Sequence, residues 1–557
     1  MASRFWRVGR GRGSWSPPPA AKIMGRLRLA LRRARLSPPE CLLIGLTALV
    51  LIAGLTLGAG TPVAYAVVVL PAVVALTWWR PAYGFALLLG LVLVTEEFEI
   101  LTIPQGRFAG GNPPLLRLLP LYRNLGPLFA NALELWLVFV TATWAVQAAA
   151  RRRWRLAPVP CGAAWAAAVV VIVAAFAAGI ERGGDIKVAL WEIRALAYLL
   201  GLLWLVPQLV ERRRDLLVIA WALVLGLGAK AAEGLYRYFA VVHMRLGPNE
   251  TFMAHEEPVM FVPLVFLFLL LTYHRARSAL WRMLLLVAPA MFLVLALTQR
   301  RTTYVTLPLC SVFFSFLIPR AALRKYACHV AAAVGAVGIY VLLFAGSSSP
   351  LARPIERGLT LFDSFNSSNL YRILENENLH YTITQHPWGI AFGHRYEMFY
   401  RLPRIDFSLA EYIPHNEILW VWVKTGTLGF IVIMFFFARM VAESVWTYRH
   451  LRDPLLRALA GIVGLAVINQ LVVSYFDLQL TYSRSMIYLG TLGGLLTPLQ
   501  RLGGLARDVV VVRLWTDGSV GDPAHRLARP LAALPAQEEP VGCCGPAPVL
   551  RLEGEHP

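Results

Sequence analysis

A His-Asn pair at the start of a long apolar run is the first place where side chains of this chain could do chemistry. His415 and Asn416 lie in residues 411–437, EYIPHNEILWVWVKTGTLGFIVIMFFF, which begin as a polar stretch and continue as an apolar one. An imidazole is the side chain best suited to move a proton near neutral pH. Asn416 is also a good helix cap, so the same pair could simply begin a helix. The two residues alone leave both interpretations open.

Arginines in and beside apolar runs form the second group of candidates. Arg300 and Arg301 follow one run in LTQRRTTYVTL, and Arg194 lies inside another, ALWEIRALAYLLGLLWLV. A guanidinium binds phosphate through paired hydrogen bonds, and an arginine within a membrane is costly unless it has a partner. These arginines are therefore candidates for binding a phosphate group. Snorkelling to lipid headgroups, or pairing between helices, is the alternative.

A polar stripe, Lys230, Glu233 and Arg237, forms the third group. Spacings of three and four residues place these side chains on one face of a helix, where they would line a cavity or neutralise one another. Glu96 and Glu97 are a weaker feature. They could bind a divalent cation, but acids near a helix end more often face solvent. We expect no metal site.

The composition shows what kind of protein must position these groups. Of the 557 residues, 57% are hydrophobic and 15% are charged, whereas a soluble domain has about 45–50% apolar and about 25% charged residues. The chain is therefore expected to be a polytopic membrane protein. Its net charge of +21 comes largely from short basic clusters between apolar runs, as the positive-inside rule requires, so no nucleic-acid partner is expected.

A membrane span needs about 20 apolar residues, and the sequence predicts about 12–14 spans. They fall near residues 41–57, 63–79, 83–94, 128–149, 162–179, 188–210, 216–242, 258–273, 280–298, 304–318, 326–345, 416–440, 455–476 and 482–499.

The basic clusters also predict an orientation. If residues 1–38 are a basic cytoplasmic N-terminus, then every second connection should be basic, and six of them are. This places transmembrane helices 1–11 in residues 39–345, one large outer loop in residues 346–414 and the last helices in residues 415–500. Residues 501–557 are expected to be a cytoplasmic, disordered tail. His415 then lies on the outer face.

Four segments together resemble the O-antigen ligase and polymerase superfamily of bacterial inner-membrane proteins. HNEILWVWVKTGTLGF from His415 is similar to a His-Asn, then Gly-x-x-Gly signature at the end of that family's large periplasmic loop. LYRILENENLHYTITQHPWGIAFGHRYE resembles its Arg, then His-Pro-x-x-Gly-x-Gly stretch. LTQRRTTYVTL and Arg194 resemble two arginine positions in earlier spans. Arg300, Thr302 and Lys424 depart from the family pattern, which usually has Ser, Gly and an acidic residue there.

The resemblance implies an all-α, GT-C-like membrane fold with one large periplasmic loop, in the bacterial inner membrane, with both termini cytoplasmic. It implies transfer of a glycan from an undecaprenyl-diphosphate donor to a glycan, a lipid A-core or another acceptor, with no cofactor and no required metal. Membrane lipids are the other expected partners. A polysaccharide exporter or lipid flippase is the alternative, and the sequence does not distinguish a ligase from a polymerase.

The resemblance also suggests roles for the candidate residues. His415 is expected to be the acceptor-side base, oriented by Asn416 or by a group of the loop. The predicted diphosphate-binding residues are Arg301, Arg194, Arg300 and Arg372, and the predicted cavity-lining residues are Lys230, Glu233, Arg237 and His386.

Overall fold

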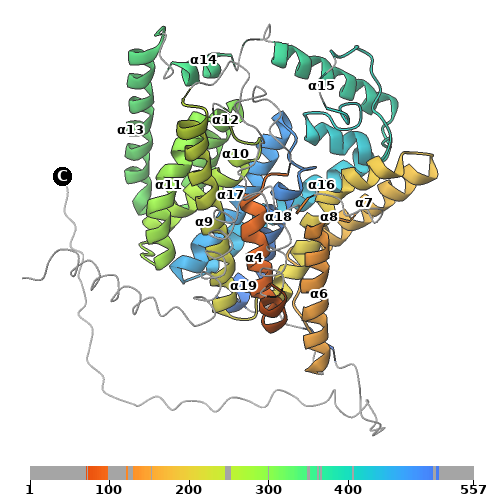
Figure 1. Ribbon diagram of the computed structural model, residues 1–557, viewed down its shortest axis with the longest axis vertical. Coiled ribbons are helices and arrows are strands. Elements are labelled where there is room, and N and C mark those ends of the chain that lie inside the picture. Colours follow the sequence, from red (N-terminus) through yellow and green to blue (C-terminus); the bar gives the residue numbers. More distant parts are fainter. Residues whose placement is uncertain are drawn as a thin grey trace, which may run out of the picture. The chain divides into compact units, whose positions relative to one another are not determined.

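The computed structural model describes residues 71–512, apart from residues 72, 98–120, 123–129, 152–153, 245–251, 299, 348–351, 361–362, 364–366, 404, 406 and 506–509. The described chain is helical except for two three-residue strands, which pair antiparallel (Figure 1). In chain order the elements are α4 (Pro81–Val94), α6 (Ala132–Ala150), β1 (Trp154–Leu156), α7 (Gly162–Glu181), α8 (Ile186–Leu209), α9 (Arg213–Tyr236), the π-helical turn η3 (Arg237–Val241), α10 (Glu257–Tyr273), α11 (Ala279–Leu297), α12 (Arg301–Leu317), α13 (Arg320–Phe344), α14 (Arg353–Leu359), α15 (Ser367–Gln385), α16 (Glu417–His450), α17 (Pro454–Phe476), α18 (Ser483–Gly494), α19 (Leu496–Leu502) and β2 (Val510–Val512).

Eight helices of the described chain are long and apolar enough to cross a membrane: α6, α7, α8, α9 with η3, α11, α13, α16 and α17. Helices α4 and α10 are shorter apolar helices. Most ends of these ten helices lie within a few residues of the ends of the apolar runs in the sequence. This agreement confirms the predicted all-α, polytopic membrane fold. The predicted span 41–57, the N-terminus 1–38 and the tail from residue 513 lie outside the described residues.

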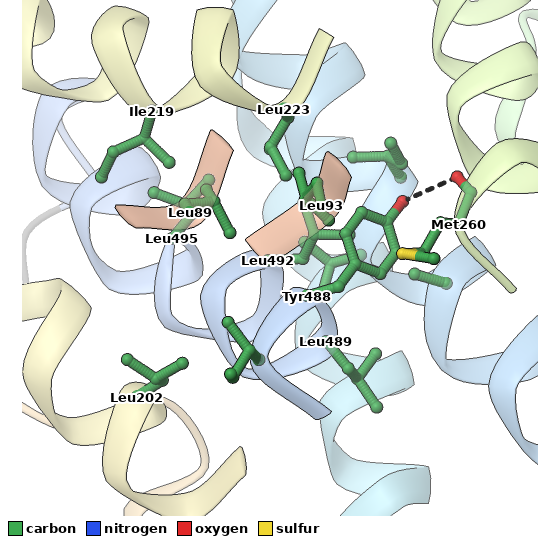
Figure 2. Packing of buried hydrophobic residues seen from close by; sticks show 14 of the residues in the cluster. Leu89, Leu93, Leu202, Ile219, Leu223, Met260, Tyr488, Leu489, Leu492 and Leu495 are labelled. Carbon is green, nitrogen blue, oxygen red and sulfur yellow. Dashed lines mark hydrogen bonds between the residues drawn. The ribbon is translucent and has the colours of Figure 1, made fainter. Parts of the chain in front are cut away.

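Helix α18 is buried among other helices. Figure 2 shows leucines of α4, α8 and α9 around it, and the Tyr488 hydroxyl donates a hydrogen bond to the carbonyl of Met260 at 3.3 Å. A Cβ atom at Gly490 would lie 2.9 Å from the carbonyl oxygen of Leu199 in α8. The two helices therefore pack almost backbone to backbone, as small residues allow between membrane helices. This packing fixes α18, and with it the loop that precedes it.

Helix α16 is broken at Gly426, where φ is 71° and ψ is 177°. Glycine adopts this backbone conformation without the steric cost that a Cβ would bring. Two carbonyls just before the break accept hydrogen bonds from the backbone N–H groups of Ile390 and Ala391, at 2.9 and 3.1 Å. The segment HPWGIAFGH, residues 386–394 of the large loop, is therefore attached to α16 through the main chain.

A buried ion pair holds the same junction. The ammonium of Lys424 in α16 lies 2.7 Å from a carboxylate oxygen of Glu192 in α8, and both side chains are fully buried. The other oxygen of Glu192 accepts a hydrogen bond from the backbone of Gly393 at 2.6 Å, and Lys424 also donates to the carbonyl of His394. The pair thus joins α8, α16 and the loop segment. The carboxylate of Glu192 thus compensates the charge of a lysine that lies fully buried.

Candidate functional site

His415 is held by a carboxylate of α15, the helix of the large loop that packs beside the start of α16 (Figure 1). Its Nδ1 lies 3.2 Å from both oxygens of Glu375, and its backbone N–H donates to the same carboxylate at 2.9 Å. Glu375 is 1% exposed and the imidazole is 22% exposed. An ionised carboxylate only accepts hydrogen bonds, so in a neutral imidazole with this contact Nδ1 carries the proton and Nε2 the lone pair. This is the tautomer that a general base requires.

Asn416 uses its side chain to join two helices. Its Oδ1 accepts a hydrogen bond from the backbone of Leu419 at 3.2 Å and so caps α16. Its Nδ2 donates to Asn376 of α15 at 3.1 Å. The group in contact with the imidazole of His415 is thus Glu375, while Asn416 sets the start of α16 against α15.

A second carboxylate, Asp477, lies at the end of α17 among four basic side chains. Its Oδ2 is 2.9 Å from Nδ1 of His255. Although burial acts to raise it, the pKa of this carboxyl is held well below its ordinary value by His255, Arg372 and His415 nearby. Arg300 also lies close, with one guanidinium nitrogen 3.0 Å from Nδ1 of His255. Two guanidinium groups and two imidazoles therefore lie around Asp477, and together they offer more hydrogen-bond donors than this carboxylate accepts.

Both arginines of this cluster have an unused donor. Among the described residues, the buried Nε atoms of Arg300 and Arg372 have no hydrogen-bond partner. Other nitrogens of Arg300 contact His255 and the carbonyl of Met253, and Arg372 donates to Ser368 at 3.0 Å. Burial lowers the pKa of the Arg300 guanidinium even though carboxylates lie near it. An anion bound here would supply acceptors for these two unused donors.

The loop between α17 and α18 is fixed by Glu417. The carboxylate of Glu417 accepts hydrogen bonds from the backbone N–H groups of residues 479–481 and from the hydroxyl of Thr481. Glu417 follows His415 by two residues, and the loop begins at Asp477. These hydrogen bonds therefore hold two parts of the site together that are far apart in the sequence.

Arg301 contacts the large loop. Its guanidinium donates to Asn369 at 2.6 Å and to Ser368 at 3.1 Å, at the beginning of α15. Ser368 is also the partner of Arg372. Arg301 thus connects the first turn of α12 to the helix that carries Arg372 and Glu375.

Arg194 lies in a separate polar region. Its Nε is 3.2 Å from Glu134 of α6, and it lines a cavity of about 90 Å³. Burial, together with the charge of Glu256, raises the pKa of Glu97 in this cavity to about 8. The other lining residues are Tyr122, Asn131, Trp191, Thr481 and Ser483. Thr481 is also held by Glu417, so the loop between α17 and α18 borders both this cavity and the Asp477 cluster.

Lys230, Glu233 and Arg237 form a neutral ion network with Glu96. Lys230 lies 2.8 Å from Glu96 and 3.2 Å from Glu233. Arg237 lies 2.7 Å from Glu96 and also pairs with Glu233. The side chains of Lys230 and Glu96 are fully buried. Two acids and two bases balance, so the stripe connects α9 to the segment after α4 as a buried crosslink.

His386 is exposed, whereas the other predicted site residues are buried or half-buried. Its imidazole is 44% exposed and lies 2.8 Å from Glu397. It begins the segment that docks on α16, and its ion pair helps to shape that segment.

Three residues of the site, His255, Glu375 and Asp477, were not predicted from the sequence. His255 and Asp477 each stand at the end of an apolar run, next to the predicted spans 258–273 and 455–476. A search for titratable residues at span ends on the side of His415 would have found both. Glu375 could have been found only if residues 367–385 of the polar loop had been predicted as a helix. In a helix, Glu375 lies one turn after Arg372 and on the same face.

Comparison with known proteins adds a family match to this description. Residues 286–434 match the family described as O-Antigen ligase. The matched part runs from α11 to the middle of α16 and includes Arg300, Arg372, Glu375 and His415, whereas Asp477 lies beyond it. No curated protein matches the chain. Residues 286–434 of this helical membrane protein are therefore similar to the O-antigen ligase family, which supports the resemblance seen in the sequence.

Proposed function

We propose that this chain is a membrane glycosyltransferase that transfers a glycan from an undecaprenyl-diphosphate donor to a hydroxyl acceptor on the periplasmic side. The observation that carries the proposal is the cluster around Asp477, where two arginines with unused buried donors lie near His415. A lipid diphosphate is a polyanion at headgroup depth, so it offers acceptors for the unused donors of Arg300 and Arg372. The acceptor hydroxyl, in turn, needs a base.

The roles of the residues follow from these contacts. Arg300 and Arg372 bind the donor diphosphate. His415 removes the proton from the acceptor hydroxyl through Nε2, while Glu375 holds the imidazole in the required orientation and stabilises it when it becomes charged.

The other arginines have different places in the proposal. Arg301 supports donor binding through Ser368 and Asn369, because it positions the helix that carries Arg372. Arg194 is a second donor-side contact, at the cavity that it shares with Thr481.

Purified full-length protein in lipid nanodiscs provides the direct test. The probe is an undecaprenyl-diphosphate-linked glycan, offered with lipid A-core or with a second donor molecule as acceptor, and the released undecaprenyl diphosphate is measured. We expect release that depends on the acceptor and is insensitive to a chelator. Arg300→Ala and Arg372→Ala should each weaken donor binding about 10-fold or more, as expected for a lost charge-assisted hydrogen bond. Arg401→Ala, at an exposed arginine of the same loop, should behave like the wild type.

The same assay separates a transferase from an exporter, since an exporter moves the glycan without releasing undecaprenyl diphosphate. Failure to release it with either acceptor would contradict the proposal. In cells, loss of the gene should leave unattached chains if the enzyme is a ligase and single repeat units if it is a polymerase. Reporter fusions at the two termini test the proposed cytoplasmic location of both.

A further inference from the structure

His255 forms a second imidazole–carboxylate pair in the turn before α10. Its Nδ1 lies 2.9 Å from Oδ2 of Asp477; the imidazole is 44% exposed and the carboxylate is 11% exposed. Asp477 occupies Nδ1, so Nε2 lies on the opposite side of the ring. Within the described residues, the only group in hydrogen-bond range of Nε2 is the Arg300 guanidinium.

The position of Arg300 decides what could bind at Nε2. The same guanidinium nitrogen lies 3.0 Å from Nδ1 and 3.3 Å from Nε2 of His255. A donor that is almost equally far from both ring nitrogens is not aligned with the lone pair of either. An oxygen that bonds to Nε2 would therefore also lie close to a guanidinium, and only an anion gains from both neighbours.

We propose that His255 contacts the terminal phosphate of the lipid diphosphate on the leaving-group side of the reaction, opposite to His415. This inference rests on the proposed function. The imidazole binds in its doubly protonated form, with Asp477 at Nδ1 and a phosphate oxygen at Nε2. The negative charge of the added diphosphate then compensates the positive charges of the His255 imidazolium and the Arg300 guanidinium.

The chemical step assigns one side of the reacting carbon to each histidine. The acceptor oxygen forms a bond to the anomeric carbon while the bond from that carbon to the phosphate oxygen breaks. The acceptor proton moves to Nε2 of His415, and the electron pair of the broken bond stays on the phosphate oxygen. His255 and Arg300 donate hydrogen bonds to that oxygen as its charge increases, which lowers the barrier.

The reverse assignment, with His255 as the base, fits the contacts less well. In the proposed complex both ring nitrogens of His255 already carry protons, directed at Asp477 and at a phosphate oxygen, so the ring has no lone pair for the acceptor proton. His415 is in contact with a carboxylate of its own, Glu375, and among the described residues no arginine lies in hydrogen-bond range of its ring.

Binding of undecaprenyl diphosphate and of undecaprenyl phosphate to the full-length protein in nanodiscs tests this assignment. We expect His255→Ala to weaken undecaprenyl diphosphate binding about 10-fold or more and to remove most of the preference over the monophosphate. His255→Gln keeps a neutral N–H donor of similar size and should recover part of the binding. His415→Ala should bind undecaprenyl diphosphate within about twofold of the wild type while losing transfer. His380→Ala, at an exposed histidine of α15, is the matched control.

The outcomes separate the two proposals. If the wild type neither binds undecaprenyl diphosphate nor transfers glycan, the proposed function itself is wrong. If the wild type does both, and His255→Ala and His255→Gln keep its affinity, its preference and its rate, the assignment of His255 is overturned. Competition by inorganic diphosphate with equal strength would show that the site binds free diphosphate without a lipid, and this result would also overturn the assignment.

Discussion

The two imidazole–carboxylate pairs differ in their surroundings. In the His415–Glu375 pair the imidazole is 22% exposed, its carboxylate is 1% exposed, and the carboxylate also binds the backbone of the histidine. In the His255–Asp477 pair the imidazole is 44% exposed and lies against Arg300. The first pair fixes one histidine rigidly beside an anion. The second places a histidine within a group of cations.

The proposed reaction assigns one end of a group transfer to each pair. In it, Glu375 stabilises the positive charge that His415 acquires as a base. Arg300 and Arg372, beside His255, stabilise the negative charge that develops on the leaving group. Four experiments test this contrast.

The largest effect is expected for His415→Ala. Loss of a general base slows a reaction by about 10²–10⁴-fold. The rate of transfer should therefore fall by at least about 100-fold, while donor binding persists. Rates of undecaprenyl diphosphate release in nanodiscs measure the effect. A variant that keeps more than a tenth of the wild-type rate would remove His415 from the reaction.

The next effect, on stability, concerns the junction that supports the first pair. Lys424→Met leaves Glu192 buried and unpaired, which should lower the free energy of unfolding by about 3–5 kcal/mol. Adding Glu192→Gln removes the buried charge and should restore part of this loss. Thermal unfolding of both variants measures the coupling. Equal stabilities of Lys424→Met and the wild type would mean that the ion pair does not hold the loop to α16.

Glu375→Gln tests the orientation of the base. The amide keeps the size of the carboxylate but can donate to Nδ1 of His415, which favours the wrong tautomer. We expect a fall of about 100-fold in kcat, smaller than for His415→Ala, with little change in KM. If KM rises instead and kcat stays the same, Glu375 serves donor or acceptor binding and the two pairs do not differ as proposed.

The smallest effect is expected for the acid stability of Asp477→Asn. The pKa of Asp477 is lowered from its ordinary 3.8 in the folded protein. An acid with a depressed pKa stabilises the fold above its unfolded pKa, and this contribution is lost as the pH falls below about 3.8. The variant should therefore be less stable than the wild type by about 1–2 kcal/mol near pH 7, and the gap should narrow toward pH 3. A gap that stays constant over this range would show that His255, Arg372 and His415 do not interact with the charge of Asp477.

The apolar runs predicted the membrane fold well, because lipid requires helices of about 20 residues whatever they pack against. The runs near 258–273 and 455–476, for example, are α10 and α17 with ends that differ by at most one residue. Residue type alone also made His415, Arg300, Arg301 and Arg194 candidates, since these side chains are costly near a membrane unless they act. Arg372 became a candidate only through the resemblance.

The partners of these residues could not be predicted in the same way. Helix α15 buries Tyr371, Glu375, Asn378, Leu379 and Thr382 at helical spacing, but most of these side chains are polar, so the hydrophobic pattern of a helix is absent. The division of roles between Arg300 and Arg301 depends on the direction of two adjacent side chains at a helix start. The pairing of Lys424 with Glu192 depends on the break at Gly426. Each is decided by tertiary contacts.

The attachment of residues 386–394 to α16 has a consequence for the substitutions that this junction accepts. Its two hydrogen bonds join main-chain groups, so they do not depend on the side chain of Ile390. Ala391 and Gly426, in contrast, each have a φ of 71°, a backbone conformation that favours glycine. Sequence change at the junction is therefore limited by backbone conformation at residues 391 and 426 more than by side-chain chemistry at residue 390.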